Sequence, residues 1–319
     1  MKTRIGLDIG GTKTAARVVD EAGQPLAEVV RPTDVATPDR LVAGVVATVD
    51  QALAAAGAMR SELVAAGVGV PGQVDPRTGT VSLAVNLHLH QPYPLRDALQ
   101  TALGVPVTLE NDVRAAAWGA FHRATAEQPI ASLAYLSIGT GIAAGLVLDG
   151  RLYRGAHGMA GEIGHIPVDP AGPRCRCGAY GCLEVYAAGP AIAAQAAAIT
   201  SANSRLPQTN EVYALADAGD PAARAIVERA AGFLARAVYL LVMAYDVEQV
   251  VLGGGVTRAG APFERPLRHA LATLCADSSL AASMLPDEKI VVAPADFNAG
   301  VVGAVYLADP DAAQLADWR

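Results

Sequence analysis

The apolar residues in the first third of the chain fall into short runs that are separated by glycine-containing turns. Residues 3–9, 15–19 and 25–31 form such runs, and the turns between them lie at 10–12 and 21–23. Short apolar runs bounded by turn residues are typical of β-strands that follow one another directly. The sequence therefore predicts that the chain begins with three strands.

Two long helices carry clear signals at their ends. Thr37 is a good N-cap residue, Pro38 suits the first helical position and Gly57 lies just past the end, so a helix is expected to begin at Pro38 and run to about residue 56. Asp220 and Pro221 give the same signal for a helix that runs to about residue 245. A closing helix is expected over residues 299–307.

Further strands are expected between and after these helices. Residues 63–70 form a buried strand that ends at Pro71-Gly72. Residues 105–109 form another, which leads into Glu110-Asn111-Asp112 and an alanine-rich helix. In the second half, residues 249–252 and 289–293 are apolar runs of strand length.

The initial pattern then repeats in the middle of the chain. Residues 133–138 are an apolar run, Gly139-Thr140-Gly141 is a turn, and the runs 144–148 and 151–154 follow. This is the order of strands and Gly-Thr turn with which the chain begins. The repeat predicts a duplicated α/β domain, with a cleft between two facing Gly-Thr hairpins.

The stretch from 155 to 189 shows no clear period, and a loop of that length in a compact protein is usually functional or held by a staple. Within it, residues 162–184 contain three of the four cysteines and one of the six histidines. His165, Cys175, Cys177 and Cys182 are the ligand set of a closed tetrahedral zinc site. Four protein ligands leave no open position, so the zinc is expected to be structural; the alternative is a reduced, metal-free loop. Cys275 stands apart on a predicted helix and is expected to be a small buried hydrophobe.

Composition limits the classes of function. The chain has 319 residues, enough for two domains, and is 52% hydrophobic with a net charge of −7. An acidic balance argues against a nucleic-acid surface, which needs concentrated Lys and Arg. No signal-peptide core follows the N-terminus, and charged residues interrupt the apolar stretch 222–245, so no bilayer-crossing segment is expected. A cytoplasmic protein is the simplest interpretation.

The turn Asp8-Ile-Gly-Gly-Thr-Lys-Thr is a candidate phosphate site. Glycines in a tight hairpin let backbone N–H groups approach phosphate oxygens, and Asp8 can hold Mg²⁺. A plain β-turn that needs glycine is the alternative when the motif is taken alone. The second Gly-Thr hairpin at 139–141 favours the phosphate interpretation. A third glycine turn, Gly253-Gly254-Gly255, is as consistent with a simple loop as with a nucleotide contact.

Glu110-Asn111-Asp112 is a candidate catalytic segment. A carboxylate at the start of a helix is often only a cap or a partner of the helix dipole. The functional alternative is a general base, because transfer of a phosphoryl group to a sugar hydroxyl requires the hydroxyl proton to leave. Asn111 offers a donor and an acceptor to neighbouring hydroxyls.

Together these motifs resemble the ROK family of bacterial sugar kinases and related repressors, over nearly the whole chain. The resemblance is carried by Asp8-x-Gly-Gly-Thr-x-Thr, Pro71-Gly72, Asn86, Glu110-Asn111-Asp112, Gly139-Thr140-Gly141, Glu162-x-Gly-His165, Cys175-x-Cys-Gly-x-x-Gly-Cys182-x-Glu184 and Gly253-Gly-Gly. It implies an actin-like ATPase (ribonuclease-H-like) α/β fold in two lobes, with ATP between the lobes and the sugar deeper in the cleft. The small lobe would comprise residues 1–118 plus 300–319. The large lobe would comprise residues 119–299 with the zinc-stapled loop 155–189.

The resemblance also implies residue roles. Asp112 would be the catalytic base. The sugar would be bound by Gly72, Asn86, Asn111, Asp112, Glu162, His165 and Glu184. ATP and its Mg²⁺ would be bound by Asp8, Gly10, Gly11, Thr12, Lys13, Thr140, Gly141, Gly254 and Gly255. His165, Cys175, Cys177 and Cys182 would hold the structural Zn²⁺, with the second ring nitrogen of His165 facing the sugar.

Several positions depart from the common family pattern. Arg114 stands where many members have Asn, Ala143-Ala144 replaces a glycine-richer hairpin, and Leu183 stands where glucokinases often have Trp. His88 and His90 follow Asn86 in Leu-His-Leu-His, where glucokinases often carry a Gly-Trp pair.

Three hypotheses for function follow. The first is an ATP-dependent hexose 6-kinase of carbohydrate metabolism, with glucose as the first choice of sugar, N-acetylglucosamine a close second, and N-acetylmannosamine or fructose as further alternatives. The second is a non-catalytic, sugar-responsive regulator of the same family, which the first strand beginning at Thr3 and the acidic charge disfavour. The third is a zinc-ribbon binding module, which does not account for the hairpins. The partners expected are the sugar and ATP, with no nucleic acid or membrane, and the resemblance implies a homodimer or homotetramer.

Overall fold

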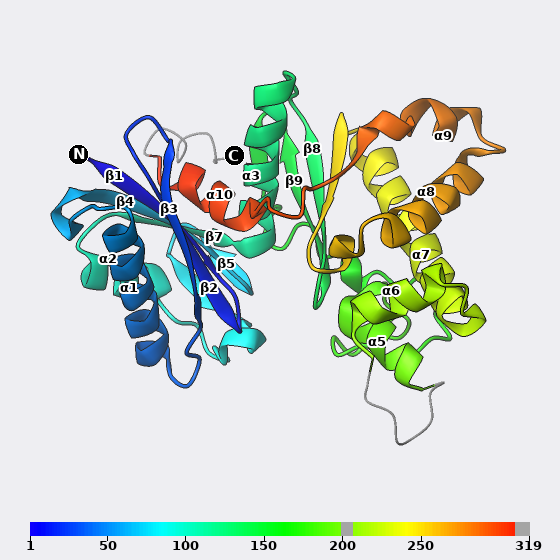
Figure 1. Cartoon of the computed structure of the whole chain (residues 1–319), viewed down its shortest axis with the longest axis horizontal. Coiled ribbons are helices and arrows are strands. Elements are labelled where there is room, and N and C mark those ends of the chain that lie inside the picture. The colour runs from blue at the N-terminus through cyan, green and yellow to red at the C-terminus, as the bar shows by residue number, and fades with distance from the viewer. Residues whose placement is uncertain (199–206, 310–319) are drawn as a thin grey trace. The chain divides into compact units, whose positions relative to one another are not determined.

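The computed structural model describes residues 1–198 and 207–309 (Figure 1). The chain divides into two compact units. The first unit comprises Met1–Ala131, Gly145–Ala160 and the described part of Phe297–Arg319, and the second comprises Ser132–Ala144 and Gly161–Asp296. The lobe boundaries predicted from the sequence, at 118/119 and 299/300, stay a prediction, and residues 310–319 of that division lie outside the described residues.

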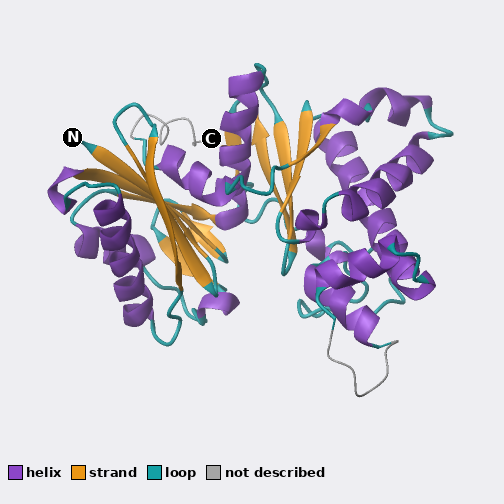
Figure 2. Ribbon diagram, in the orientation of Figure 1, coloured by secondary structure: helices purple, strands orange, loops and turns teal. Residues whose placement is uncertain are grey.

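Two five-stranded sheets form the framework (Figure 2). The strands of the first have the order β3-β2-β1-β4-β7, and those of the second have the order β10-β9-β8-β11-β12. The strands are β1 Thr3–Ile9, β2 Lys13–Val19, β3 Pro25–Pro32, β4 Leu63–Val70, β5 Gln73–Asp75, β6 Thr80–Ser82, β7 Val107–Asn111, β8 Leu133–Ile138, β9 Ile142–Leu148, β10 Arg151–Tyr153, β11 Gln249–Gly253 and β12 Ile290–Val292. The short strands β5 and β6 pair separately.

The two sheets share one topology. In the first, β1, β2 and β3 pair antiparallel, and β4 and β7 continue the sheet parallel to β1. In the second, β9 and β10 pair antiparallel, and β11 and β12 continue the sheet parallel to β8. The predicted duplication of an α/β domain is confirmed by this repeated order.

Helices connect and cover the sheets. They are α1 Pro38–Ala55, α2 Leu95–Leu103, α3 Asp112–Glu127, α4 Glu184–Ala187, α5 Gly189–Ala197, α6 Thr209–Asp217, α7 Pro221–Tyr245, α8 Ala261–Cys275, α9 Ser279–Met284 and α10 Ala299–Leu307. The predicted N-cap of α1 is correct, since the Thr37 hydroxyl accepts from the backbone N–H of Arg40 at 3.2 Å. Among the described helices none is both long and apolar enough to span a bilayer.

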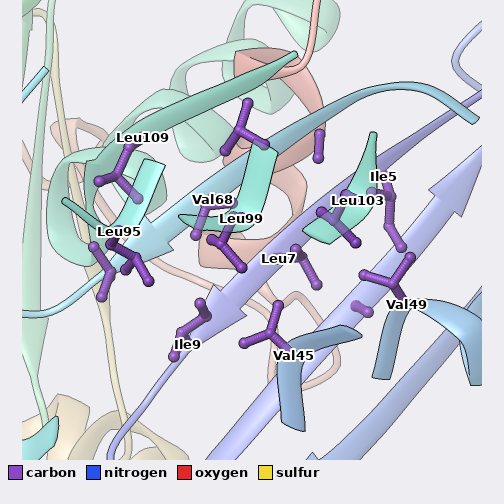
Figure 3. Close-up of a cluster of buried hydrophobic side chains, with 14 of the residues drawn as sticks. Ile5, Leu7, Ile9, Val45, Val49, Val68, Leu95, Leu99, Leu103 and Leu109 are labelled. Atoms are coloured by element: carbon purple, nitrogen blue, oxygen red, sulfur yellow. The ribbon is translucent and has the colours of Figure 1, made fainter. Parts of the chain in front are cut away.

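The core of the first unit determines which way the β1 side chains point. Ile5, Leu7 and Ile9 are fully buried and pack with residues of α1 and α2 such as Val45 and Leu99 (Figure 3). Because successive side chains of a strand point to opposite faces, Asp8 faces the other side, where α10 packs on β1. An ionisable residue near the end of a buried strand is thereby kept out of the apolar core.

Several elements differ from the sequence-based expectation. The strand expected over 105–109 is β7, Val107–Asn111, because it pairs in parallel with β4 from Ala66↔Val107 to Val70↔Asn111. Glu110 and Asn111 therefore belong to the strand rather than to the turn after it. Cys275 ends α8 and is partly exposed, so its predicted burial is wrong.

Candidate functional site

The first Gly-Thr hairpin joins β1 to β2 in the first unit. The backbone N–H of Gly10 donates to the carbonyl oxygen of Lys13 at 2.9 Å, which closes the turn, and the side chains of Thr12 and Lys13 are exposed. A Cβ on Gly11 would lie 2.6 Å from the carbonyl oxygen of Asn86, so only glycine allows the loop that carries Asn86 to approach this closely. The hairpin and Asn86, predicted for different ligands, are thus neighbours.

Asp8 has an unusual electrostatic environment. Its pKa is raised to about 7, chiefly by burial and then by the negative charge of Asp112, while Lys13 opposes the shift. The start of α10 lies against it, since a Cβ on Gly300 would be 2.7 Å from Asp8 Oδ2. Asp8 at the end of β1 and Asp112 at the start of α3 therefore lie close enough for the negative charge of Asp112 to raise the pKa of Asp8. A cation bound between them would favour the ionised form of both.

The junction of β7 and α3 holds Asn111 and Asp112. Asn111 is the N-cap of α3, and its Oδ1 accepts from the backbone N–H of Val113 at 3.0 Å and of Arg114 at 3.2 Å. Its amide Nδ2 donates to the carbonyl oxygen of Gly72 at 3.2 Å. Asp112 is the first residue of α3 and is partly exposed. Asn111 is thus the N-cap, and Asp112 Oδ1 shares the backbone N–H of Val113 with it, at 2.9 Å.

An ion cluster lies directly below this junction. Glu110 is completely buried, and its carboxylate accepts from Arg114 Nε at 2.7 Å and from Arg154 Nε at 2.6 Å. Arg114 follows Glu110 by four residues, and the pair joins the end of β7 to the first turn of α3. Arg154 is distant in sequence, and no local pattern indicated its pairing.

In the second unit, the hairpin 139–141 lies beside the third glycine turn. Gly139 donates its backbone N–H to the carbonyl oxygen of Gly141 at 2.9 Å. Gly254 has a φ of 96°, and a Cβ there would lie 2.4 to 2.7 Å from backbone atoms of Ile138 at the end of β8. Only glycine fits both the conformation and the contact. The hairpin 139–141 and the turn 253–255 are therefore neighbours, since a Cβ on Gly139 would also lie 3.9 Å from the backbone nitrogen of Gly255.

Glu184 ties this hairpin to the cysteine loop. Its Oε2 accepts the backbone N–H of Ile142 at 3.0 Å, and its Oε1 pairs with Arg176 Nε at 3.1 Å. Arg176 stands between two of the cysteines, and sequence analysis did not single it out. A carboxylate retains further lone pairs beyond these two contacts, so Glu184 can still accept hydrogen bonds from hydroxyl groups.

The segment with Glu162 and His165 runs along β9. Ala144 donates its backbone N–H to the carbonyl oxygen of Gly161 at 2.7 Å, and residues Ile163–His165 form a 3₁₀ turn. Glu162 is exposed, and His165 is partly buried. Both residues therefore lie near the start of β9, where Glu184 is bound.

The four predicted metal ligands converge. One ligand atom of each of His165, Cys175, Cys177 and Cys182 lies within 4.8 Å of the others. Cys177 Sγ and Cys182 Sγ are 3.6 Å apart, and Cys175 Sγ is 3.6 Å from His165 Nδ1. A tetrahedron with Zn–S bonds of about 2.3 Å has sulfurs roughly 3.8 Å apart, whereas a disulfide needs about 2.05 Å. The donor set and its spacing fit Zn²⁺ held through Nδ1 of the histidine, with Nε2 left for another contact.

The predicted site residues form two groups, one in each unit. The first unit holds Asp8, Gly10, Gly11, Thr12, Lys13, Gly72, Asn86, Asn111 and Asp112. The second holds Thr140, Gly141, Glu162, His165, Cys175, Cys177, Cys182, Glu184, Gly254 and Gly255. Each group contains one Gly-Thr hairpin and carboxylates beside it. Such a pair of groups supplies backbone donors for phosphates and carboxylate acceptors for hydroxyls.

Comparisons with known proteins bear on this chemistry. A sequence model described as "ROK family" matches residues 4–310. A glucokinase of Streptomyces coelicolor is 31% identical, over 98% of this chain and 99% of the relative. An N-acetylmannosamine kinase of Citrobacter koseri is 33% identical, over 96% of this chain and 99% of the relative. The crystal structure of a ROK family glucokinase from Streptomyces griseus, in complex with glucose and AMPPNP, is 32% identical, with a TM-score of 0.80, over 96% of this chain and 99% of that one.

Proposed function

The chain belongs to the ROK family and is a sugar kinase, and we propose that it transfers the γ-phosphoryl group of ATP to the 6-hydroxyl of a hexose, with glucose as its preferred substrate. The observation that carries the proposal is the likeness over nearly the whole chain to a glucokinase structure that holds glucose and AMPPNP. The first unit adds local support. There the Asp8 hairpin, Asn86 and Asn111-Asp112 lie on neighbouring elements.

The nucleotide would be bound by backbone amides and hydroxyls. Thr12, Lys13 and Thr140 offer exposed donors on the two hairpins, and Gly254-Gly255 lies beside the second hairpin. Asp8 would bind Mg²⁺, because its carboxylate is crowded by a second negative charge and a divalent cation would offset that repulsion. Bound Mg²⁺ supplies neutralisation of phosphate charge. The protein residues hold the phosphates in place for transfer.

Asp112 would act as the general base. It stands at the first position of α3, partly exposed, while Asn111 fills the capping role and is itself fixed to Gly72. A carboxylate in this position can accept the proton that leaves the 6-hydroxyl during transfer. The other hydroxyls would be contacted by Gly72, Asn86, Asn111, Glu162, His165 and Glu184.

The zinc would be structural. Four protein ligands leave no open coordination position, so the ion supplies rigidity and no reaction step. Its role would be to hold Arg176 and Glu184 against the hairpin 139–141 and to fix the ring of His165, whose Nε2 would face the sugar. Metal-bound imidazoles commonly donate through their second nitrogen.

N-acetylmannosamine or N-acetylglucosamine is the alternative substrate. The N-acetylmannosamine kinase of C. koseri is as similar to this chain as the glucokinases are. The candidate sugars differ chiefly at the 2-position, where an acetamido group is larger than a hydroxyl and presents an N–H donor. Fructose is a weaker alternative. We further propose a cytoplasmic homodimer or homotetramer, which size-exclusion chromatography with light scattering would test.

The deciding experiment is a substrate panel. kcat/KM is measured with ATP and Mg²⁺ for glucose, N-acetylglucosamine, N-acetylmannosamine and fructose. We expect glucose to exceed each of the others by at least tenfold, with glucose 6-phosphate as the product by mass spectrometry and NMR. A higher kcat/KM for an N-acetylhexosamine would reassign the substrate. Failure to phosphorylate any hexose would overturn the kinase proposal for this chain.

A further inference from the structure

Glu110, Arg114 and Arg154 form a buried ion cluster, here called the Glu110 cluster, at the end of β7. The side chains of Glu110 and Arg114 are 0% and 4% exposed, and that of Arg154 is 16% exposed. Both carboxylate oxygens are used, Oε1 by Arg114 Nε and Oε2 by Arg154 Nε. The cluster therefore joins three separate segments of the first unit: the end of β7, the first turn of α3 and the residue after β10.

The cluster is bonded directly to the backbone around Asp112. Glu110 Oε1 accepts not only from Arg114 but also from the backbone N–H of Asn111 at 2.8 Å. The backbone N–H of Arg114 in turn donates to Asn111 Oδ1 at 3.2 Å. In the sequence, Asp112 thus lies between Asn111, whose backbone N–H donates to Glu110, and Arg114, whose side chain belongs to the cluster. A displacement of the cluster must move the backbone that carries Asp112.

The loop after β10 is held by the same cluster. Arg114 Nη1 donates to the carbonyl oxygen of Gly158 at 2.8 Å, and Gln73 Nε2 donates to that of His157 at 3.3 Å. Arg154 stands at the beginning of this loop. Arg154 and Arg114 of the cluster therefore hold the two ends of residues 154–158 next to the α3 N-terminus, and Gln73 adds an uncharged contact.

Stability alone gives a poor reason for such a cluster. Burial by itself would raise the pKa of Glu110, but the two guanidinium groups and the Asn111 N–H outweigh it and hold the pKa below its ordinary value, so the carboxylate stays ionised. One arginine would be enough to neutralise the Glu110 carboxylate, yet two arginines pair with it. Buried ion pairs often contribute little more than apolar side chains of the same volume, because desolvation offsets their attraction. What the two arginines add is a fixed geometry.

We propose that Glu110, Arg114 and Arg154 are positioning residues that fix the Asn111-Asp112 backbone, and with it the direction in which the Asp112 carboxylate points. The inference rests on the proposed function of Asp112 as the base. Arg114, which departs from the asparagine common in the family, is in this chain the member that connects α3 to the 154–158 loop. A misplacement of the base by about 1 Å can cost on the order of 100-fold in rate.

Two variants test the proposal, Arg114→Gln and Arg154→Gln. Each is compared with Arg123→Gln, which removes an arginine from the same helix α3, where it pairs with Glu127 at the surface. We expect the two cluster variants to lower kcat for the hexose by roughly 10- to 100-fold while KM for sugar and ATP changes less than threefold. Calorimetric titration with sugar counts the binding sites, so kcat is expressed per folded site. Arg154→Lys, which keeps the charge without the guanidinium, should recover only part of the loss.

Hydrogen exchange gives a readout that does not depend on activity. In the cluster variants the amide of Asn111 loses the fixed acceptor geometry of Glu110, so a peptide spanning residues 107–116 should exchange at least fivefold faster than in Arg123→Gln. If Arg114→Gln does not fold, the same measurements are made on Arg154→Gln alone, because the side chain of Arg154 is the less buried of the two arginines. Unchanged exchange, or an unchanged kcat per site, overturns the positioning role. A third outcome is faster exchange in the cluster variants together with a wild-type protein that phosphorylates no hexose. That outcome would confirm that the cluster fixes the backbone, and it would reject the kinase proposal instead.

Discussion

Glu184 and Ile142 are joined by a hydrogen bond of 3.0 Å, in which the backbone N–H at the start of β9 donates to the carboxylate. The bond ties a residue proposed to bind the sugar to the hairpin proposed to bind phosphate, and Arg176 neutralises the same carboxylate. Sugar and nucleotide binding should therefore be linked through this contact.

Replacement of Glu184 tests that link. In Glu184→Gln the amide keeps one acceptor oxygen but loses the charge that pairs with Arg176. We expect kcat/KM for the hexose to fall roughly 10- to 100-fold, and KM for ATP to rise by a smaller factor because a neutral amide oxygen binds the Ile142 N–H more weakly than the carboxylate does. Steady-state kinetics in both substrates measures this. Glu288→Gln, at an exposed position of the same unit, is the control and should behave as wild type. An unchanged KM for ATP would refute the link.

Asp112→Asn tests the base. The amide preserves size and most hydrogen bonds but cannot take up a proton, so kcat should fall roughly 100- to 10,000-fold. KM for the hexose should stay within about threefold, since the hydroxyl contacts remain. Asp39→Asn, a change at an exposed aspartate in the first turn of α1, separates the loss of a base from the loss of a helix-terminal charge. Turnover near the wild-type value in Asp112→Asn would exclude Asp112 as the base.

The parts of the site that were predictable from sequence are those whose residues lie close together in the chain. The two Gly-Thr hairpins and the cysteine set can each be recognised from a short stretch of sequence. The structure brings the four predicted metal ligands together. The strand order follows from the repeated pattern. The contacts that join distant segments were not predictable, because nothing local to Arg154 distinguishes it from a solvated arginine.

The boundaries that sequence analysis missed have a tertiary cause. β7 was expected to end at Leu109, but its parallel pairing with β4 carries it to Asn111. That shift buries Glu110 and places Asn111 where it can cap α3. Arg176 escaped notice for a similar reason, since only the folded cysteine loop brings it to Glu184. The pairing of β4 with β7 and that of Arg176 with Glu184 cannot be predicted from local sequence propensity.

The charge on Asp8 should cost the ligand-free protein stability at neutral pH. The pKa is about 7 in the folded chain against an ordinary value of 3.8, so between these values the folded state holds a proton that the unfolded state has lost. The contribution of Asp8 to stability is therefore fully present below pH 3.8 and is lost as the pH rises through 7. Asp8→Asn removes this penalty. We expect a gain on the order of 1–2 kcal/mol at pH 8 for this half-buried group, or a few degrees in Tm, and a smaller gain at pH 5.

Thermal denaturation of wild type and Asp8→Asn at both pH values checks the sign. Asp277→Asn, at an exposed site, should give no difference that grows with pH. The same Asp8→Asn variant should lose most of its kinase activity, because the proposed Mg²⁺ contact is gone. A gain in Tm that is equal at pH 5 and pH 8 would show that the ionisation of Asp8 does not carry the effect.

Removal of one cysteine tests whether the metal cluster supports the sugar site. Cys177 is the exposed member of the set, so Cys177→Ala removes a ligand while leaving the packing of the loop interior intact. We expect the variant to lose stoichiometric zinc by mass spectrometry and elemental analysis, and to raise KM for the hexose at least tenfold, because Arg176 and Glu184 are no longer held at the hairpin. Chelator treatment of wild type should have the same effect and zinc should reverse it. Cys275→Ala, at the end of α8, should change neither zinc content nor KM. Full zinc loss with an unchanged KM for the hexose would mean that the cluster does not support the sugar site.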